Sequence, residues 1–341
     1  MTLLVLNGGS STLKYALYEE GLQAGRRGKL EHDGTAADFR RCLSGLLAEL
    51  GSPRIRAVGH RVVHGGADYS APILLDANHI EALRRLTPLA PLHQPHNLAG
   101  IDAVTQLLPG VPQVACFDTA FHHDQPALAQ WLGLTRELHE SGMRRYGFHG
   151  ISFEYIAAQL PAHLGAKADG RVIVAHLGSG ASLCALHRRR SIATTMGFST
   201  LDGLLMATRC GNLDPGAVLH LMQERGMDAA TIADLLYQRS GLLGVSGISG
   251  DMRTLLASET PEAREAVDLF CYRVLREIGS LAAALGGVDA LVFTGGIGEH
   301  AQPIRERIGA GLGWLGPDLT VLALATDEES LIAQQTARLC P

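Results

Sequence analysis

Three charged side chains stand where an open α/β sheet would place groups that bind a ligand. Arg61 and Asp118 each end an apolar run, and Arg209 follows the apolar residues 204–207. Open α/β sheets bind ligands at the carboxyl ends of their strands. Arginines neutralise charge on a transferring phosphoryl group or a carboxylate substrate, and carboxylates bind Mg²⁺. A buried structural ion pair is the alternative interpretation for each residue.

Glycine-rich turns follow several of the expected strands. They are Gly8-Gly9-Ser10-Ser11, Gly178-Ser179-Gly180 and Gly295-Gly296-Ile297-Gly298. Glycine adopts positive φ angles, so successive N–H groups can converge on an anion, and Lys14 adds a cation on the strand leaving the first turn. The P-loop pattern G-x-x-x-x-G-K-[ST] is absent, which excludes a Walker-type NTPase. One such turn would be equally typical of a plain hairpin, but three in one chain favour phosphate binding.

A dinucleotide site is an alternative interpretation of the last of these turns. The segment from Gly296 to Ala301 matches the pattern G-x-G-x-x-A. The acidic residue of such a site should end the next strand about 20 residues on. Asp327 and Glu328 end an expected strand at 320–325, but about 30 residues on. A nicotinamide oxidoreductase therefore stays open as a weaker reading.

A zinc site at His60 and His64 is disfavoured. These residues are four apart, a spacing that suits zinc only on a helix. The flanking glycines and paired valines indicate a strand, in which such residues lie ~13 Å apart. Individually, the other histidines in glycine- and proline-rich segments are more typical of structural hydrogen bonds.

Composition excludes several classes of protein. The 341 residues suffice for two domains, and 29 Lys and Arg against 34 Asp and Glu give a net charge of −5. There is no basic excess to hold a nucleic acid and no basic tract for anionic lipid. No apolar stretch approaches the ~20 residues of a membrane span. The six cysteines are scattered without C-x-x-C spacing, so we expect a reducing cytoplasm.

The elements that must position these residues alternate along the chain. Apolar runs bounded by glycine indicate buried strands at residues 3–6, 57–63, 172–175 and 290–293. Helical patterns lie between them, at residues 37–50, 79–86, 97–108, 152–160, 217–224, 229–239 and Pro261–Leu285. The alternation predicts an α/β protein.

A short internal repeat suggests that the two halves of the chain are related. A shift of 170 residues places Gly8 on Gly178 and Thr12 on Ser182. Both segments read as strand, glycine–hydroxyl turn, strand. Two such hairpins would place two phosphate-binding turns across one cleft. We expect the halves to meet near residues 148–152.

At these residues the chain resembles the acetate kinase family. The matching segments follow the family's order over nearly the whole chain, at residues 7–14, 60–66, 117–122, 146–150, 176–182, 208–216, 246–253, 293–299 and 326–329. The resemblance implies an α/β fold of the sugar-kinase, heat-shock and actin type, duplicated in two lobes with a nucleotide cleft between them. The N-terminal lobe would span 1–148, with a C-terminal helix at about 329–341 packing back on it, and the nucleotide-binding lobe 149–328.

The resemblance also implies an activity, which is reversible phosphoryl transfer between ATP and acetate to give ADP and acetyl phosphate. The enzyme would be a cytoplasmic homodimer that needs Mg²⁺ or Mn²⁺ and binds neither nucleic acid nor membrane. Direct in-line transfer is the expected mechanism, with positioning and charge neutralisation as the main contributions. A carboxylate oxygen is already a nucleophile, so Asp118 need not act as its base.

Residue roles follow from the same resemblance. The residues implied in catalysis are Asp118, His149 and Arg209. Those implied in substrate binding are Arg61, Val63, Leu92, His93, Phe148 and Thr200. Those implied in nucleotide binding are Lys14, His176, Leu177, Gly178, Ser179, Gly180, Asp251, Met252, Arg253, Gly296, Ile297, Gly298, Glu299 and His300. The metal residues would be Asn7 and Glu328.

The chain departs from the family pattern in five respects. Ser179 stands where the family usually has Asn, Thr200 replaces Pro, Ala67 replaces Glu and His300 replaces Asn. The chain also lacks roughly 30 residues before Ala57 and roughly 20 between Gly298 and Thr326. These changes bear on nucleotide preference, acyl specificity and dimer contacts, while the implied catalytic set is intact.

Two further classes of function remain as alternatives. A kinase for propionate or another short carboxylate would use the same residues. An actin-like nucleotide switch would share the fold, but it has no second anionic substrate that would require both Arg61 and Arg209.

Overall fold

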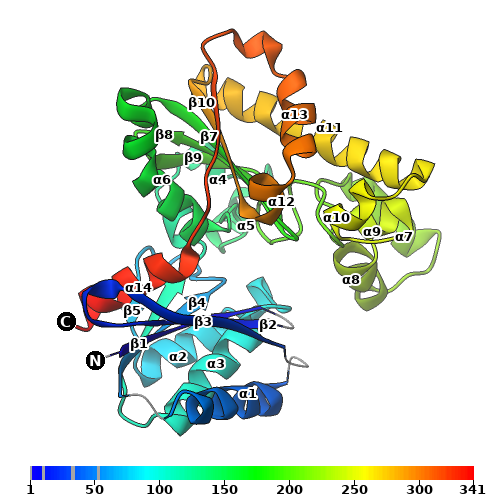
Figure 1. Cartoon of the computed structure of the whole chain (residues 1–341). Helices are drawn as coiled ribbons and strands as arrows, with labels where there is room; N and C mark the ends of the chain where they lie inside the picture. Colours follow the sequence, from blue (N-terminus) through cyan, green and yellow to red (C-terminus); the bar gives the residue numbers. More distant parts are fainter. Residues whose placement is uncertain (1, 10–11, 32–34, 52–53) are drawn as a thin grey trace. The chain divides into compact units, whose positions relative to one another are not determined.

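The computed structural model describes residues 2–9, 12–31, 35–51 and 54–341 (Figure 1). The chain forms two compact units. Unit 1 comprises Met1–His123, Phe148–Tyr155 and Asp327–Pro341, and unit 2 comprises Asp124–Gly147 and Ile156–Thr326.

This division differs from the expected lobes, 1–148 and 149–328, in three segments. Residues 124–147 group with unit 2, whereas residues 149–155 and 327–328 group with unit 1. Helix α6, Gly150–Leu164, begins in unit 1 and continues into unit 2 after Tyr155. The helical periodicity of the sequence is the same on both sides of Tyr155, so it does not indicate where the helix passes from one unit to the other.

Unit 1 is built on a six-stranded sheet with the order β3-β2-β1-β4-β6-β5. Its strands are β1 Thr2–Gly8, β2 Thr12–Tyr18, β3 Ala24–Glu31, β4 Ile55–Val62, β5 Ile73–Leu74 and β6 Gln113–Phe117. β1 is antiparallel to β2 but parallel to β4, and β4 is parallel to β6.

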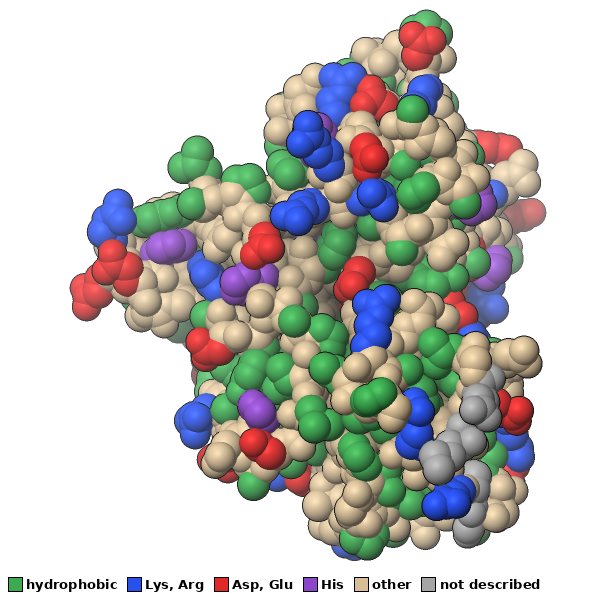
Figure 2. Space-filling view, turned by 90° about the vertical axis from the view of Figure 1, so that its left-hand side faces the viewer, with side chains coloured by type: hydrophobic (Ala, Val, Ile, Leu, Met, Phe, Trp, Pro, Cys, Tyr) green, Lys and Arg blue, Asp and Glu red, His purple; other side chains and the backbone are tan. Residues whose placement is uncertain are grey.

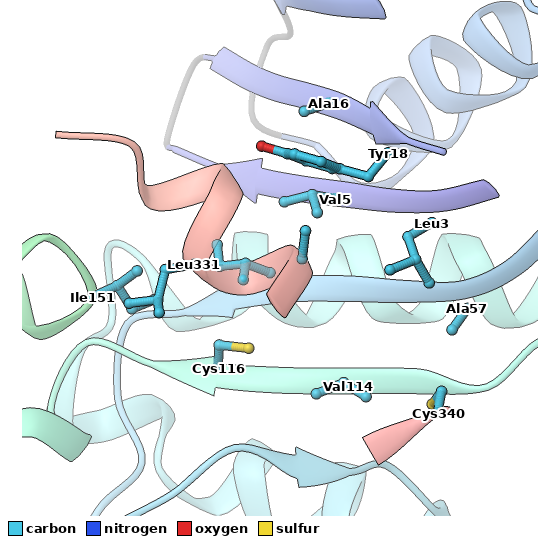
Figure 3. Close-up of a cluster of buried hydrophobic side chains, with 12 residues drawn as sticks. Leu3, Val5, Ala16, Tyr18, Ala57, Val114, Cys116, Ile151, Leu331 and Cys340 are labelled. Carbon is cyan, nitrogen blue, oxygen red and sulfur yellow. The ribbon is translucent and has the colours of Figure 1, made fainter. Parts of the chain in front are cut away.

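Helices cover both faces of this sheet. α1 (Ala36–Glu49), α2 (Ala77–Arg85) and α3 (Gln94–Leu107) pack on one face, with Leu4 and Leu6 of β1 beneath them. α14 (Glu328–Leu339) packs on the other face against Leu3 and Val5 (Figure 3). Successive strand residues point to opposite faces, so burial of both faces explains the continuous apolar run.

Unit 2 repeats the same strand arrangement. Its sheet has the order β11-β10-β7-β8-β9, built from β7 Arg171–Leu177, β8 Ala181–His187, β9 Arg190–Thr194, β10 Ala290–Thr294 and β11 Thr320–Ala323. Read from β9, this order and its strand directions match β3-β2-β1-β4-β6 of unit 1. The hairpins β1–β2 and β7–β8 are therefore equivalent, as the 170-residue repeat predicts.

The remaining helices belong mainly to unit 2. They are α4 Ala127–Gln130, α5 Arg136–Glu140, α7 Pro215–Gln223, α8 Ala229–Gln238, α9 Gly241–Ser246, α10 Met252–Leu256, α11 Pro261–Leu285, α12 Gly295–His300 and α13 Gln302–Ala310. Short 3₁₀ turns occur at Glu20–Leu22, Thr87–Leu89, Ala120–His122, Gly165–Asp169 and Gly313–Leu315. α11 has the predicted bounds: Thr260 caps it through the Ala263 N–H, and Gly286 ends it at φ 70°.

The surface and the cysteines agree with the composition. All six cysteines are free thiols. Among the described residues, no helix is both long and apolar enough to cross a bilayer. On the face shown in Figure 2, acidic and basic side chains are interspersed.

Docking of α14 depends on a glycine in the adjacent strand. A Cβ atom on Gly59 of β4 would lie 2.7 Å from Ile332 Cγ2 and would overlap Thr336 Oγ1. Gly59→Ala should therefore displace α14 and lower the free energy of unfolding by ~1–3 kcal/mol. The matched control is Gly45→Ala in α1, where nothing lies within 4 Å of the added atom. That variant should be stabilised by ~0.5–1 kcal/mol. Denaturant unfolding of both variants tests this, and equal effects would contradict it.

Candidate active site

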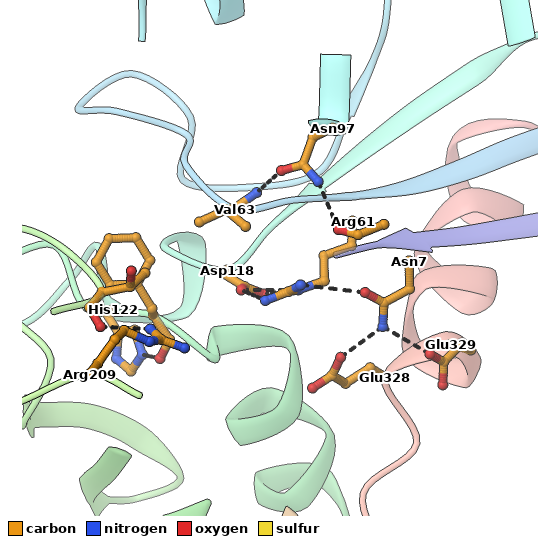
Figure 4. Close-up of polar contacts among 12 residues, drawn as sticks. Asn7, Arg61, Val63, Asn97, Asp118, His122, Arg209, Glu328 and Glu329 are labelled. Carbon is orange, nitrogen blue, oxygen red and sulfur yellow. Dashed lines mark hydrogen bonds and ion pairs between the residues drawn. The ribbon is translucent and has the colours of Figure 1, made fainter. Parts of the chain in front are cut away.

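Arg61 and Asp118 form an ion pair in unit 1, with a buried carboxylate and a guanidinium group that is 18% exposed. Arg61 lies near the end of β4, and Asp118 follows β6, its parallel neighbour. Arg61 Nε donates to both carboxylate oxygens at 3.1 Å, and Nη2 makes a closer contact with Oδ2 (Figure 4). Asp118 is only 1% exposed. The sequence placed both residues at strand ends, and the structure shows that they contact each other.

Burial and neighbouring charges act in opposite directions on this pair. Burial raises the pKa of Asp118, against the lowering effects of the Arg61 guanidinium and the His149 backbone N–H. Burial alone would lower the pKa of Arg61, but the carboxylates of Asp118 and Glu328 outweigh it and raise that pKa above its ordinary value. Arg61 therefore stays charged, as a group that binds an anion must.

His149 contributes its backbone N–H to the site as a hydrogen-bond donor. Its φ angle is 59°, a left-handed conformation uncommon for residues other than glycine. The His149 backbone N–H donates to the Asp118 carboxylate and acts to lower the pKa of that carboxyl. The next residue, Gly150, donates its N–H to the Asp118 carbonyl at 2.8 Å. The start of α6 is thus fixed to the end of β6.

Asn7 and Glu328, 321 positions apart, meet in unit 1. Asn7 Nδ2 donates to Glu328 Oε2 at 3.0 Å and to Glu329 Oε1 at 2.9 Å (Figure 4). Arg61 Nη1 lies 3.5 Å from Asn7 Oδ1. Glu329 was not among the expected site residues, although it lies beside Glu328 in the family-matching segment 326–329.

The cap of α14 is Asp327, which leaves Glu328 for another role. Asp327 Oδ1 accepts the Ser330 N–H at 2.9 Å, and Asp327 Oδ2 pairs with Arg27 at 2.7 Å. Because Asp327 caps a helix and Glu328 contacts Asn7, neither carboxylate occupies the position that a dinucleotide site requires. The interpretation of the chain as a nicotinamide oxidoreductase therefore lacks the acidic residue that a dinucleotide site requires.

The oxygen-rich chemistry around Asn7 fits a hard cation. Carboxylate and amide oxygens are the ligands that Mg²⁺ and Mn²⁺ prefer. Asn7, Glu328 and Glu329 supply them, and Lys14 lies directly across the β1–β2 pair from Asn7. Within the described ranges, no three His, Cys, Asp or Glu side chains form a cage by themselves. A cation here would need water or phosphate oxygens as further ligands.

Asn97 joins two of the strand ends that carry site residues. Its Oδ1 accepts the Val63 N–H at 2.9 Å, and its Nδ2 donates to the Gly8 carbonyl at 3.1 Å (Figure 4). Asn97 is 4% exposed, within α3. The end of β1 and the residue after β4 are thus held together by one amide side chain. No pattern in the sequence singles out Asn97.

The expected acyl-binding residues are apolar and mostly buried. Val63 and Phe148 are buried in unit 1, and Leu92 is partly exposed at 38%. His93 precedes α3 at its N-terminus. The His64 ring packs edge-on against Phe148, with ring centroids 5.6 Å apart. His122 Nε2 lies 3.0 Å from the Phe148 carbonyl, and burial lowers the pKa of His122 to about 4. A neutral His122 can therefore donate to that carbonyl at neutral pH.

In unit 2, two glycine turns share one edge of the sheet. The turn at Gly178–Gly180 follows β7, closed by a hydrogen bond of 3.0 Å from Gly178 N to Gly180 O. The Gly295–Gly298 segment follows the parallel neighbour β10. A Cβ atom on Gly178 would lie 4.0 Å from Gly296 N, so the two backbones are adjacent. This edge carries eight of the expected nucleotide residues: His176, Leu177, Gly178, Ser179, Gly180, Gly296, Ile297 and Gly298.

Thr200 and Arg209 are also joined within unit 2. Arg209 Nη1 donates to the Thr200 carbonyl at 2.7 Å. The loop carrying Thr200 is anchored by Arg145, whose Nη1 lies 3.0 Å from Asp202 Oδ2 and 3.2 Å from the Thr195 carbonyl. Arg145 and Asp202 were not among the expected site residues, although the hydrogen bonds of Arg145 hold this loop in place.

The other expected nucleotide residues differ in exposure. Asp251 caps α10 and pairs with Arg253 at 3.1 Å, while Met252 is buried. The side chains of Arg253 and His300 are 90% and 80% exposed. Glu299 turns its carboxylate back onto neighbouring backbone groups.

Known proteins resemble this chain over almost its whole length. The acetokinase family model matches residues 27–340. An acetate kinase of Rhodopseudomonas palustris is 52% identical over 389 aligned positions, covering 99% of this chain and 98% of the relative. Because this chain has 341 residues, at least 48 of those positions lack a counterpart in it. An acetate kinase of Methylocella silvestris is 44% identical, with coverage of 99% and 97%.

Solved structures agree with the sequence comparison. A propionate kinase from Francisella tularensis has a TM-score of 0.92 at 36% identity, covering 99% of both chains. The acetate kinase of Porphyromonas gingivalis has a TM-score of 0.87 at 34% identity, covering 100% of both chains. The duplicated sheets and the expected α/β fold are thus those of this group of enzymes. The chain belongs to the acetokinase family.

Proposed function

We propose that this protein catalyses reversible phosphoryl transfer between ATP and acetate, giving ADP and acetyl phosphate. The observation that carries the proposal is the Arg61–Asp118 pair beside Asn7 and Glu328. The named relatives, which this chain matches over nearly its full length, support acetate kinase activity.

Arg61 would bind the carboxylate or its acyl phosphate. Asp118 holds the guanidinium through the single Nε–H, shared between both carboxylate oxygens, and through Nη2, which together fix its plane. A planar, charged fork matches a carboxylate or a phosphate. Apolar Val63 and Phe148 would receive the methyl group of acetate. A pre-oriented acceptor loses little freedom at the moment of transfer, which lowers the barrier.

Phosphoryl transfer needs charge neutralisation more than acid–base chemistry. The carboxylate oxygen of acetate is already a nucleophile, so Asp118 orients Arg61 and need not remove a proton. Arg209 and His149 would stabilise charge on the transferring group. The nucleotide would bind through the glycine turns of unit 2, with Lys14 on its phosphates. Mg²⁺ or Mn²⁺, held through Asn7 and Glu328, supplies positive charge to the phosphate oxygens.

Two finer proposals concern assembly and location. We infer a homodimer, supported by exposed apolar side chains in and beside α7, namely Leu213, Leu219 and Met222. We also infer a cytoplasmic protein, because six free thiols suit a reducing compartment. No role with nucleic acid or membrane is proposed.

Propionate kinase is the second candidate, because the Francisella tularensis structure with the TM-score of 0.92 carries that name. An assay that converts acyl phosphate to its hydroxamate, run with ATP, Mg²⁺ and a series of short carboxylates, separates the two. We expect acetate to give the highest kcat/KM. No hydroxamate with any carboxylate would refute the proposed function, and butyrate exceeding acetate would refute the acetate assignment.

Arg61→Ala and Arg209→Ala should each lower kcat/KM a few hundred-fold. Loss of one preorganised charge contact in a transition state costs ~3–4 kcal/mol. Because Arg61→Ala leaves Asp118 buried without its partner, Arg61→Lys is the variant that keeps the pair and the fold. It should also stay impaired, since an ammonium lacks the planar fork. Arg264→Ala on the exposed face of α11 is the control. Near-normal turnover of an arginine variant would remove that arginine from the mechanism.

Glu328→Gln should raise the Mg²⁺ concentration needed for half-maximal activity. The substitution keeps a side chain that can reach Asn7 but removes the charge that a hard cation prefers. Stability should change little, because Asp327 and not Glu328 caps α14. Glu306→Gln, exposed on α13, is the matched control. A Mg²⁺ activation curve identical to that of the unmodified enzyme would exclude Glu328 from the metal site.

Thr200→Pro should change the acetate-to-propionate ratio of kcat/KM more than it changes the KM for ATP. Proline restores the usual family residue and stiffens the loop, but it keeps the carbonyl that orients Arg209. One methylene is worth ~1–3 kcal/mol in such a pocket, so discrimination should not exceed about 200-fold. Thr200→Val, which removes only the hydroxyl, is the matched variant. A constant ratio with altered ATP binding would place Thr200 outside the acyl pocket.

A further inference from the structure

One oxygen of the Glu299 carboxylate collects donors from two separate segments. Glu299 Oε1 lies 3.0 Å from Gly295 N, 3.1 Å from Thr326 N and 3.5 Å from Thr294 Oγ1. The side chain is 18% exposed. Thr294 and Gly295 begin the glycine turn after β10, whereas Thr326 lies 27 residues beyond Glu299. Glu299 therefore connects the turn to the segment that follows β11.

The glycine turn at Gly295–Gly298 is the first turn of α12, and the first N–H groups of a helix have no acceptor within it. Gly295 adopts φ +77°, and a Cβ atom there would lie 2.8 Å from the Leu177 carbonyl. The turn therefore approaches the end of β7 too closely for any other residue. The Thr294 side chain does not cap this helix, so the Glu299 carboxylate supplies the acceptor for the Gly295 N–H.

The base of the Glu299 side chain is itself held in place. Arg305 Nη1 donates to the Gly298 carbonyl at 2.9 Å and to the Glu299 carbonyl at 2.8 Å. These bonds fix the last turn of α12, from which the Glu299 side chain reaches back to Gly295. The acceptor is thus rigidly placed.

Thr326 is the last residue of unit 2, and unit 1 resumes with Asp327. Just before it, Leu324 N donates to the Phe293 carbonyl at 2.9 Å. Asp327 caps α14, and Glu328 follows with its bond to Asn7. The bond from Thr326 to Glu299 therefore fixes the end of the chain segment that leads into α14.

We propose that Glu299 is a positioning residue that holds the glycine turn and Thr326 together, and that it does not contact the nucleotide. Its contribution is that of a hydrogen-bond acceptor at the right distance, and its negative charge is secondary. The link from the turn to nucleotide binding rests on the proposed function above, whereas the hydrogen bonds do not depend on it.

Two substitutions of Glu299 separate the effect of side-chain length from the effect of side-chain charge. Glu299→Gln keeps the chain length and a carbonyl oxygen that can accept all three donors, but it removes the charge. Glu299→Asp keeps the charge but is one methylene too short to reach Gly295 and Thr326 together. A residue that binds the metal or nucleotide through its charge would tolerate Asp better than Gln. A residue that acts only as a hydrogen-bond acceptor for the backbone would tolerate Gln better than Asp.

The experiment measures amide hydrogen exchange at Gly295 and Thr326 together with the KM values for ATP and acetate. Glu299→Asp and Glu299→Ala should speed exchange at both amides by about tenfold or more, the effect of losing a bond to a charged acceptor. They should raise the KM for ATP by a similar factor and leave that for acetate nearly unchanged. Glu299→Gln should stay close to the unmodified enzyme. Glu265→Asp and Glu265→Gln, the same two changes at an exposed position of α11, are the control.

Two outcomes would overturn the proposal. Unchanged exchange at both amides in Glu299→Asp would show that the bonds fix nothing. A Gln variant with protected amides but a raised KM for ATP would show a direct charge contact with the ligand. If Glu299→Ala does not fold, amide exchange and the KM for ATP in Glu299→Asp and Glu299→Gln still test the proposal. If the unmodified protein forms no acyl hydroxamate, the proposed function fails, but the exchange rates still report on the Glu299 bonds.

Discussion

The ion pair between Arg61 and Asp118 governs the polar end of unit 1. A carboxylate buried as deeply as that of Asp118 is tolerated only when it is paired, and the neighbouring ends of β4 and β6 provide the pairing. The parallel register places Arg61 opposite Cys116, two residues before Asp118, and the β1–β4 register brings Asn7 to the same edge. From this constraint follow the contact of Asn7 with Glu328 and the approach of the His149 N–H. A substrate anion would meet a guanidinium whose orientation is already fixed.

Duplication gives both units a hairpin followed by parallel strands, but the two hairpins have diverged in chemistry. In unit 1 the strand ends carry charges: Arg61, Asp118 and, across from Asn7, Lys14. In unit 2 glycines follow β7 and β10, and β1 of unit 1 shares this feature because it ends in Gly8. Charged side chains suit a small anionic substrate, whereas bare backbone N–H groups suit the phosphates of a larger ligand. One topology can thus provide two kinds of binding edge.

Turns made of glycine cannot position themselves, and in this fold single polar side chains from elsewhere hold them. Asn97 joins Gly8 at the end of β1 to Val63 after β4, and Glu299 joins the glycine turn after β10 to Thr326. Arg145 does the same through Asp202 for the loop whose Thr200 carbonyl orients Arg209. Each of these residues lies behind the groups that would touch a substrate. Their effect on activity would be indirect, through the rigidity of those groups.

The sequence alone determined what depends on neighbours along the chain. Apolar runs between glycines revealed β1, β4, β7 and β10, because both sheet faces are covered, and Pro261 and Gly286 marked the ends of α11. Motif order gave the family. Only the tertiary structure decided which groups meet: Asn7 with Glu329, Asn97 with Gly8, Glu299 with Thr326, and the crossing of α6 between units. These contacts join residues up to 322 positions apart. No local pattern encodes them, because the pairing of distant side chains is set by strand order and register, which exist only once the sheets have formed.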